Sequence, residues 1–553
     1  MDVMQPGQWS AARRAVETRA VAWLAARRAL TDPSSAHSDR VMFTRKALLE
    51  TAFLVGLRAR LDPDPLDGDY ALLMRQVQDI TSRPSYRELI ARDEAALLLY
   101  AGTYAALKLC GHDDPQFRHI IQQASAGGYA TVFERIPYRQ LDLLHTLEMC
   151  QIGNSLPTVD QVLPLTLLCN RPNVTKLADR DIYAITHTVF YATDFGLREP
   201  RWPVGTGLGE IVELLEALLV LTRARKDADL VGEVLCCLLC LGVKEADSVG
   251  QAWDFLASVQ EKDGRVNGPP GIVHTQITEG DSDYQSWATG YHTTIVAALA
   301  GILHRSPRTC NPQRAVAPPG PCTAPTDTIH RAVEWLCRTS VHHPPETGLP
   351  AAAASAYGAT AIGDPRLARP ALVHFATELT DADQGLWQKH GMEIVGEFAA
   401  GLRTLGITCP SLDRFLKAIS DIISSLTEVP PQAAANVHRL TGLGLLAPER
   451  ATALTARKTP QSNSPEQNAS LLPGLIKTYD LSRIASVVRD LVTAGWGEHR
   501  ITRDAVAFLT AQQNPNGAFG YPARDDLATR DRAQLSWTQS IVTALAELGN
   551  FNS

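Results

Sequence analysis

The sequence predicts an all-helical protein that contains repeated helical pairs. Long alternations of apolar and polar residues, which are typical of strands, are absent. Many segments instead carry apolar residues at intervals of three and four. In the helix that starts at Tyr291, for example, Ile295, Leu299 and Ile302 fall on one stripe. A pattern of helix, turn, loop and apolar helix also occurs twice, which favours a repeat architecture.

Length and composition limit the classes of protein that the chain can belong to. A chain of 553 residues predicts two or more domains, or one large helical array with an extension. The net charge of −7 gives no electrostatic case for binding nucleic acid. We find no secretory signal and no apolar run of about 18 residues, so we expect a cytoplasmic protein without a spanning segment. Three of the ten cysteines, Cys236, Cys237 and Cys240, lie in an apolar helix and are interpreted as buried free thiols.

The first part of the chain is predicted to be helical throughout. Residues 11–30 and 41–61 form two helices, and the second ends at the proline-rich stretch after Leu61. Further helices are expected at residues 70–80, 86–109, 139–150 and 162–169. We therefore expect residues 1–175 to form an N-terminal helical region.

The remainder of the chain continues as helices separated by loops. Residues 306–326 are rich in Pro and small residues, and residues 456–472 are rich in Ser, Asn, Gln and Pro, so both are predicted to be exposed loops. The predicted helices are residues 181–195, 208–222, 227–241, 248–260, 328–338, 386–405, 412–426, 433–446, 481–494, 503–512 and 535–548.

The repeat is defined by two similar turns. Gln260-x-x-Asp263-Gly264 follows one predicted helix, and Gln513-x-x-Asn516-Gly517 follows another. Asp or Asn followed by Gly supplies the left-handed residue that ends a helix. Aligning the apolar helices that come next puts Trp537 on Tyr291 and Thr538 on His292.

These turns carry a resemblance to known families. The run Gln513-Asn-Pro-Asn-Gly-Ala-Phe-Gly520 resembles the Gln-Trp-type repeat of terpenoid cyclases. The runs Asp281-Ser-Asp-Tyr-Gln-Ser-Trp287 and Tyr291-His-Thr-Thr294 resemble parts of the protein prenyltransferase β subunit. The resemblance implies an (α/α) toroid over residues 176–553, with alternating outer and inner helices around a central cavity.

One carboxylate, Asp194, is a candidate proton donor. It lies at the C-terminal end of the predicted helix 181–195, where the helix dipole disfavours an anion. Its aromatic neighbours, which include Tyr191, would disfavour the anion further if they are buried. We therefore expect a raised pKa, which suits a general acid. The alternative is an exposed Asp194 that hydrogen-bonds the following turn.

His187 lies on the same predicted helix face as Tyr191 and Asp194. We interpret this stripe as the lining of a cavity. The alternative is a buried histidine that bonds a neighbouring helix.

A zinc site is a second hypothesis for the stretch 281–292. Protein prenyltransferases take zinc ligands from an Asp-x-Cys pair and from a His, and Asp281, Asp283 and His292 resemble this set. Asp283 replaces the cysteine, and in one continuous helix Asp281 and His292 would lie roughly 16 Å apart along the axis. The sequence therefore assigns no metal and no other cofactor.

The segment Asp381-Ala-Asp383-Gln384 resembles a degraded form of the Asp-x-Asp-Asp motif of class II terpene cyclases. The middle Asp of that motif protonates the substrate, which makes Asp383 a second candidate acid. Gln384 departs from the motif. The alternative is that Asp383 caps the helix that holds Trp387.

Together the residues and the resemblance favour acid-initiated cyclisation of a prenyl-type hydrophobic substrate. The alternatives are a zinc-dependent prenyl or other group transferase and a noncatalytic toroid that binds a hydrophobic ligand or a protein. The expected partner is a small hydrophobic substrate rather than nucleic acid, and the oligomeric state is not assigned. The predicted catalytic residues are Asp194, Asp383 and His187. The predicted substrate-binding residues are Tyr191, Trp287, Tyr291, His292, Trp387 and Trp537.

Overall fold

The computed structural model describes residues 6–551 apart from several gaps. The gaps are residues 35, 37–39, 63, 93–96, 129–132, 154–155, 204, 270–281, 307–325, 380–383, 426–436, 438–440, 442, 447–463 and 522–526. Within the described residues every regular element is a helix, which confirms the all-α prediction. None of the described helices is long and apolar enough to cross a membrane.

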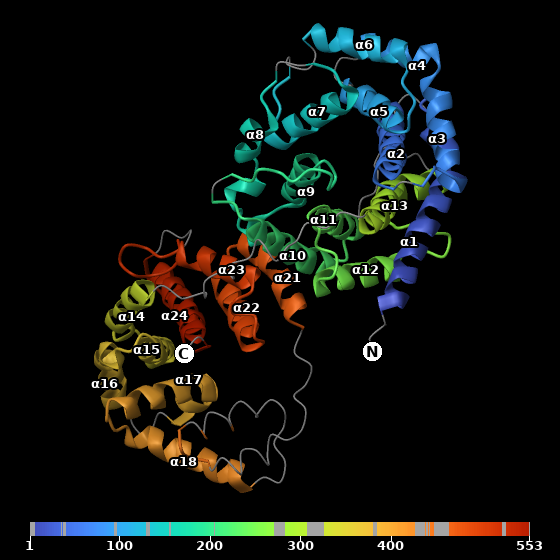
Figure 1. Cartoon of the computed structure of the whole chain (residues 1–553). Coiled ribbons are helices and arrows are strands. Elements are labelled where there is room, and N and C mark those ends of the chain that lie inside the picture. The colour runs from blue at the N-terminus through green and yellow to red at the C-terminus, as the bar shows by residue number, and fades with distance from the viewer. Residues whose placement is uncertain are drawn as a thin grey trace. The chain divides into compact units, whose positions relative to one another are not determined.

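The chain divides into two compact units, Met1–Pro319 and Gly320–Ser553. The expected boundary between residues 175 and 176 lies within unit 1. In Figure 1 the helices of unit 1 run from blue to light green and those of unit 2 from yellow to red.

Unit 1 is a set of helices joined by short connections. The α-helices are α1 (Pro6–Ala26), α2 (Val41–Leu61), α3 (Gly68–Thr81), α4 (Pro84–Arg92), α5 (Leu97–Leu109), α6 (Pro115–Ala126), α7 (Pro137–Cys150), α8 (Val159–Val162), α9 (Asp179–Thr193), α10 (Leu208–Ala224), α11 (Ala228–Cys240), α12 (Asp247–Val259) and α13 (Ser282–Arg305). Short 3₁₀ helices are η1 (Arg28–Thr31), η3 (Leu163–Leu165), η4 (Leu168–Asn170) and η5 (Val174–Lys176).

Six of these helices surround one interior. Helix α2 packs on α5, α5 on α7, α7 on α9, α9 on α11, α11 on α13, and α13 on α2. Figure 1 shows this succession around the centre of the unit. Every residue of α11 is buried, as expected of a helix that is apolar on all sides apart from Asp229 and Glu233. Helix α12 buries only a stripe at three- and four-residue spacing, which is typical of an outer helix.

The turn after α12 fastens three helices together. Gln260 pairs with Val266 in an isolated bridge, and its side chain donates a hydrogen bond of 2.9 Å to the carbonyl of Val16 on α1. The backbone N–H of Val266 donates to the hydroxyl of Thr294 on α13 at 2.9 Å. Gly264 has a left-handed backbone, with φ of +100°, and lies directly against the backbone of α1.

Unit 2 contains the same turn. Gln513 pairs with Phe519, and its side chain donates to the carbonyl of Thr328 at 2.8 Å. The N–H of Phe519 donates to the hydroxyl of Thr538 at 2.9 Å. The repeat is therefore present in the geometry, but Thr538 matches Thr294 rather than His292. The predicted alignment was wrong by two residues because the loop before each apolar helix has a different length.

Unit 2 is also built of helices that pack on one another. They are α14 (Thr326–Ser340), α15 (Pro345–Ala361), α16 (Arg369–Glu378), α17 (Gln384–Thr404), α18 (Pro410–Ser425), α21 (Pro465–Lys477), α22 (Leu481–Thr493), α23 (Arg500–Thr510) and α24 (Leu527–Phe551), with the 3₁₀ helix η7 (Pro365–Ala368). Helix α15 packs on α14, α17 and α24, and α22 packs on α24. Most of the predicted helix 433–446 lies outside the described residues.

One predicted loop is helical at its end. Residues 465–472 belong to α21. Ser464 accepts a hydrogen bond from the N–H of Gln467, whose side chain accepts one in return from the N–H of Ser464, and Pro465 occupies the first helical position. This capping box explains why a polar stretch starts a helix.

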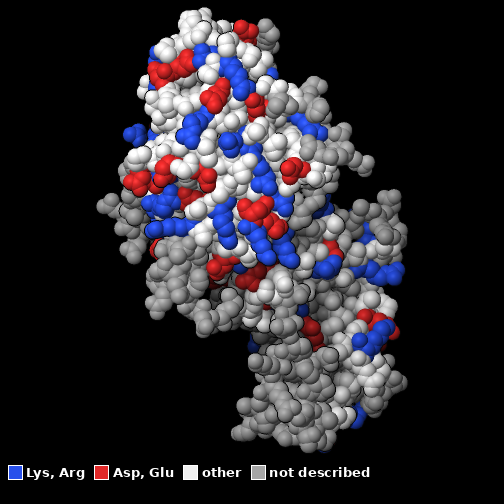
Figure 2. Space-filling view, turned by 90° about the vertical axis from the view of Figure 1, so that its right-hand side faces the viewer, with Lys and Arg blue, Asp and Glu red and all other residues white. Residues whose placement is uncertain are grey.

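The face of the molecule in Figure 2 carries both signs of charge. On the part of this face that the structure describes, basic and acidic side chains lie interspersed.

The close approach at Gly264 gives a stability prediction. A Cβ atom there would lie 2.1 Å from the carbonyl oxygen of Arg19, so the helices would have to separate. We expect Gly264→Ala to lower the free energy of unfolding by about 3 kcal/mol, at the upper end of ordinary single substitutions. Urea unfolding followed by circular dichroism measures the change.

The matched control is Gly111→Ala. Gly111 also has a positive φ, of +83°, but no heavy atom lies within 4 Å of a Cβ built there. Its substitution should cost only the backbone strain of about 1–2 kcal/mol. Equal losses in the two variants would contradict the role of the α1 contact.

Candidate active site

A cavity of about 930 Å³ lies inside unit 1. Most of its lining comes from the six helices that pack in succession, α2, α5, α7, α9, α11 and α13, and the rest from Phe195 and residues 267–269. Such a volume is within the range of small-molecule sites in proteins.

The cavity has a polar end and an apolar end. On α9 and α11 the charged and imidazole groups come first along the helix, and apolar groups follow. On α2 the residues Phe53, Leu54 and Leu57 follow Glu50, and on α13 the residues Ile295, Val296 and Leu299 follow His292. Polar residues contact polar residues across the cavity wall, and apolar residues contact apolar ones. Oε2 of Glu50 lies 3.1 Å from Nδ1 of His292, whereas the ring centroids of Phe53 and Phe195 are 5.9 Å apart. The apolar end is lined by Phe53, Leu54, Leu57, Phe190, Phe195, Ile295, Val296 and Leu299.

Two buried carboxylates on α11 form the centre of the polar end. Asp229 and Glu233 are one helical turn apart and therefore share a face. Each side chain is only 3% exposed. The helix begins after Asp227, whose side chain accepts a hydrogen bond from the N–H of Leu230. Because a buried anion is costly unless it is compensated, the neighbours of these two side chains are informative.

Hydroxyl groups from two helices hold the carboxylates in place. Asp229 accepts hydrogen bonds from Tyr183 of α9 and, at 2.8 Å, from Thr293 of α13. Glu233 accepts one from Thr186 of α9. The carboxylates thus have fixed orientations rather than free rotation.

His292 of α13 faces both carboxylates. Its Nε2 lies 3.7 Å from Oδ1 of Asp229 and 3.5 Å from Oε1 of Glu233. One ligand atom from each of the three residues lies within 4.8 Å of the others, so the group could hold a metal ion. Burial alone would lower the pKa of His292, but Glu50 and Asp229 outweigh it and raise the pKa well above 6.5.

Glu50 of α2 contacts the other nitrogen of His292. Its Oε2 lies 3.1 Å from Nδ1 of the imidazole, and its Oε1 lies 3.3 Å from Nζ of Lys46. Burial alone would raise the pKa of Glu50, but His292 and Lys46 outweigh it and lower the pKa to about 2. The polar end therefore contains three carboxylates, Lys46 and His292 in close contact.

His187 lines the same cavity from α9. Its Nδ1 lies 2.9 Å from the backbone carbonyl of Tyr183, which can only accept, so Nδ1 carries the proton of this bond. The imidazole also lies within 6.3 Å of the rings of Tyr138, Tyr183, Phe190 and Tyr191.

The structure brings several of the predicted site residues together. His187, Tyr191, Tyr291 and His292 all line the cavity. Trp287 is buried behind the wall and stacks on Tyr291 with ring centroids 5.0 Å apart.

The remaining candidates lie elsewhere. Trp387 and Trp537 belong to unit 2 and do not line this cavity. Asp281 and Asp383 lie outside the described residues. Asp283 is exposed in the first turn of α13, nine residues or roughly 13 Å along the axis from His292, and is not part of the cluster.

The prediction of a raised pKa for Asp194 was wrong. Helix α9 ends at Thr193, and Asp194 follows in a left-handed conformation with φ of +48°. Both of its oxygens accept hydrogen bonds from Arg60, at 2.7 and 2.6 Å, and Oδ1 also contacts Nε2 of His145 at 2.8 Å. Burial alone would raise the pKa of Asp194, but His145 and Arg60 outweigh it and lower the pKa to about 2.

Asp194 therefore has a structural position behind the cavity wall. Its partner His145 packs on Phe53, Tyr191 and Phe195, which line the cavity. The ion pair fixes the turn that carries Phe195. A carboxyl group with a lowered pKa is a poor proton donor near neutral pH.

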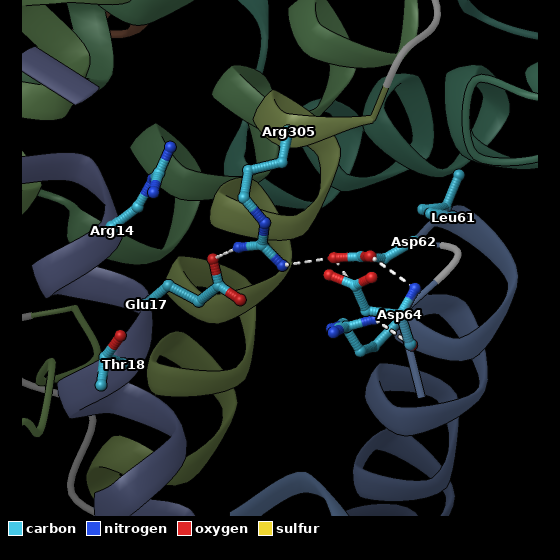
Figure 3. A pocket seen from close by; sticks show the side chains of 8 residues that line it. Arg14, Glu17, Thr18, Leu61, Asp62, Asp64 and Arg305 are labelled. Carbon is cyan, nitrogen blue, oxygen red and sulfur yellow. Dashed lines mark hydrogen bonds and ion pairs between the residues drawn. The ribbon is translucent and has the colours of Figure 1, made fainter. Parts of the chain in front are cut away.

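A second hollow of about 460 Å³ in unit 1 is polar. Figure 3 shows Arg305 of α13 between Glu17 of α1 and Asp62, which follows α2. Arg58 pairs with Asp62 at 3.3 Å, and Tyr70 donates to Glu17 at 2.8 Å. Because these charges pair with one another across α1, α2 and α13, we infer that they hold the three helices together and have a structural role.

Sequence reasoning missed Asp229, Glu233 and Glu50. The available signal was an acidic pair at a spacing of four inside the otherwise apolar helix 227–241. An acid on the buried face of an apolar helix requires a partner, but the sequence does not say which one.

The ion pair of Asp194 gives a pH-dependent prediction. Its folded pKa of about 2 lies below the ordinary 3.8, so the pair stabilises the fold above pH 4 and loses this effect as the pH falls toward 2. We expect Asp194→Asn to lower the free energy of unfolding by about 2 kcal/mol at pH 6 and by almost nothing at pH 2. Asn also tolerates the left-handed backbone, so the charge is the main change.

Urea unfolding at both pH values provides the measurement. Asp160→Asn, at a carboxylate whose side chain is 60% exposed, is the control and should change stability by less than about 0.5 kcal/mol. If Asp194→Asn lowers the free energy of unfolding by the same amount at both pH values, the lowered pKa assigned to Asp194 would be contradicted.

Comparison with known proteins assigns the chain to a protein family. No curated protein and no solved structure matches the chain. A family described as a domain of unknown function, DUF6895, matches residues 17–302. The match covers more than half of the chain, lies within unit 1 and contains every residue of the polar end. The chain therefore belongs to the DUF6895 family.

Proposed function

We propose that unit 1 is a metal-dependent enzyme that acts on a largely apolar small molecule. The observation that carries the proposal is the group of Asp229, Glu233 and His292 at the polar end of an otherwise apolar cavity. A metal held there would polarise or deprotonate a polar group of the substrate, while the apolar end receives the substrate's body.

The spacing of the three side chains supports a divalent cation such as Zn²⁺. Ligands at about 2.0–2.2 Å from a tetrahedral zinc lie about 3.4 Å from one another. The separations of 3.5 and 3.7 Å from Nε2 of His292 to the two carboxylates are close to this value. Three protein ligands leave a fourth position for water or substrate, as in catalytic zinc sites.

The charges point in the same direction. With neutral imidazoles, Asp229, Glu233 and Glu50 carry three negative charges, and Lys46 supplies one positive charge. A divalent cation would neutralise the remainder in this buried place, where unbalanced charge is costly. A protonated His292 compensates only one charge.

The chain of contacts around the cavity supports the proposal of an (α/α) toroid. Six helices contact each other in succession, and α13 returns to α2. We place the proposed toroid in unit 1, whereas the resemblance to terpenoid cyclases and prenyltransferases implied residues 176–553. A prenyl-type substrate fits the aromatic and aliphatic lining of the apolar end. A cytoplasmic location stays part of the proposal.

Acid-initiated cyclisation has less support than metal-dependent chemistry. The pKa values of Asp194, Glu50 and Glu233 are all lowered by neighbouring positive groups. None of the three carboxyl groups is therefore suited to hold a proton near neutral pH.

Zinc binding tests the proposal. Full-length protein loaded with excess ZnCl₂ and then dialysed against zinc-free buffer should retain one zinc per chain, measured by elemental analysis. Asp229→Asn and Glu233→Gln should each weaken zinc binding at least about 100-fold, more than the loss of an outer-shell partner usually costs.

The matched control is Asp142→Asn. Asp142 also lines the cavity but pairs with Arg139 and is not in the cluster. It should leave zinc affinity within about threefold of the wild type, well below the effect of a lost outer-shell partner. Zinc binding that is absent from the wild type, or equal in all variants, would contradict the proposal.

The apolar end gives a separate prediction about the substrate. Farnesol, with the longer prenyl chain, should bind the zinc-free protein more tightly than geraniol, because each buried CH₂ contributes about 0.8 kcal/mol. Phe53→Ala should weaken farnesol binding by about tenfold or more, since it removes a large apolar contact at this end.

Phe133→Ala serves as the control for this prediction. Phe133 is an exposed aromatic residue outside the cavity, so its substitution should leave binding unchanged. Calorimetric titration measures both variants. Equal affinity for farnesol and geraniol would count against a substrate whose apolar part is a prenyl chain.

A further inference from the structure

We propose that Glu50 is a positioning residue that directs Nε2 of His292 toward the metal held with Asp229 and Glu233. This inference rests on the proposed metal site and deepens it. Glu50 itself supplies no ligand, because its contact is with the opposite nitrogen of the imidazole.

The hydrogen bond between Glu50 and His292 determines the tautomer. A carboxylate can only accept, so Nδ1 of His292 carries the proton that Glu50 binds at 3.1 Å. The lone pair of a neutral imidazole is then on Nε2. Nε2 is also the nitrogen that lies 3.5 Å from Glu233 and 3.7 Å from Asp229.

Glu50 is held in place on both sides. Its Oε1 pairs with Lys46 one turn earlier on α2, and its Oε2 contacts His292. Tyr291, the neighbour of His292 on α13, lies close enough to Glu50 that burial and the Glu50 charge together raise the pKa of its hydroxyl well above 10. The carboxylate is 18% exposed and cannot easily turn away from the imidazole.

A carboxylate on the outer nitrogen of a metal-binding histidine fixes the ring and raises its basicity. Helix α2 would thereby control the affinity of a site whose ligands all come from α11 and α13. Loss of such a partner typically weakens metal binding by 10–100-fold.

The experiment measures zinc affinity of the full chain by competition with a chromogenic chelator. Glu50→Leu removes the acceptor at similar size and should weaken zinc binding by 10–100-fold. Glu50→Gln keeps an oxygen that can accept from Nδ1 and should recover most of the affinity. Glu148→Gln is the control, because this carboxylate is 60% exposed and does not line the cavity, and it should bind zinc as tightly as the wild type.

A spectroscopic measurement separates orientation from simple stability. Long-range ¹H–¹⁵N NMR of zinc-loaded protein with labelled histidine should show His292 protonated at Nδ1 in the wild type and in Glu50→Gln. Zinc on Nε2 keeps the proton on Nδ1 in Glu50→Leu as well, but without its acceptor this proton should exchange faster with solvent and its ¹H resonance should move upfield.

The outcomes distinguish this inference from the metal proposal. A wild type that binds no zinc removes both. Zinc binding that depends on Asp229 and Glu233 but is equal in the wild type and Glu50→Leu, with an unchanged resonance and exchange rate of the Nδ1 proton, overturns the role of Glu50 alone. A loss in Glu148→Gln as large as in Glu50→Leu also overturns it, because the effect would then not follow the hydrogen bond.

Discussion

The burial of two carboxylates on one apolar helix is the constraint on which unit 1 depends. Asp229 and Glu233 lie within α11, which has no exposed residue, so their charge must be compensated by neighbouring helices. Helix α9 supplies the hydroxyls of Tyr183 and Thr186. Helix α13 supplies the hydroxyl of Thr293 and the imidazole of His292. A shift of either helix by one turn, about 5.4 Å, would break these contacts. The contacts that compensate Asp229 and Glu233 therefore both form the site and fix the register of α9 and α13 on α11.

Helix α13 is fixed from two directions by consecutive residues. Thr293 donates to Asp229 inside the unit, whereas Thr294 accepts from Val266 in the turn that follows α12. That turn also contacts α1 through Gln260. At the far end of α13, Arg305 joins Glu17 and Asp62. Because the middle and the C-terminal end of the helix are fixed, His292 keeps a defined position at the cavity.

The sequence could predict the elements whose signal is local. The periodicity of α2 and α12 and the Gln-x-x-Asp-Gly turn were sufficient to locate those elements, and the stripe on α9 pointed to a cavity. Helix α15 was missed because it is buried on nearly all sides and contains Pro350, so it has no polar face to create a period.

The site residues could be predicted only in part, because their chemistry depends on distant partners. His187, Tyr191 and His292 were identified from their positions on helices. The properties of Asp194 were not, because Arg60 lies 134 residues away and reverses the pKa expected from the helix end alone. Asp229 and Glu233 became informative only once α9 and α13 were seen to surround them.

The most direct test of the metal site is an X-ray diffraction experiment at the zinc absorption edge on crystals of the full chain grown with ZnCl₂. We expect an anomalous peak in unit 1, about 2.0–2.2 Å from a carboxylate oxygen of Asp229, one of Glu233 and Nε2 of His292. Strong zinc peaks only at other positions, with His292 still in direct contact with the two carboxylates, would contradict it.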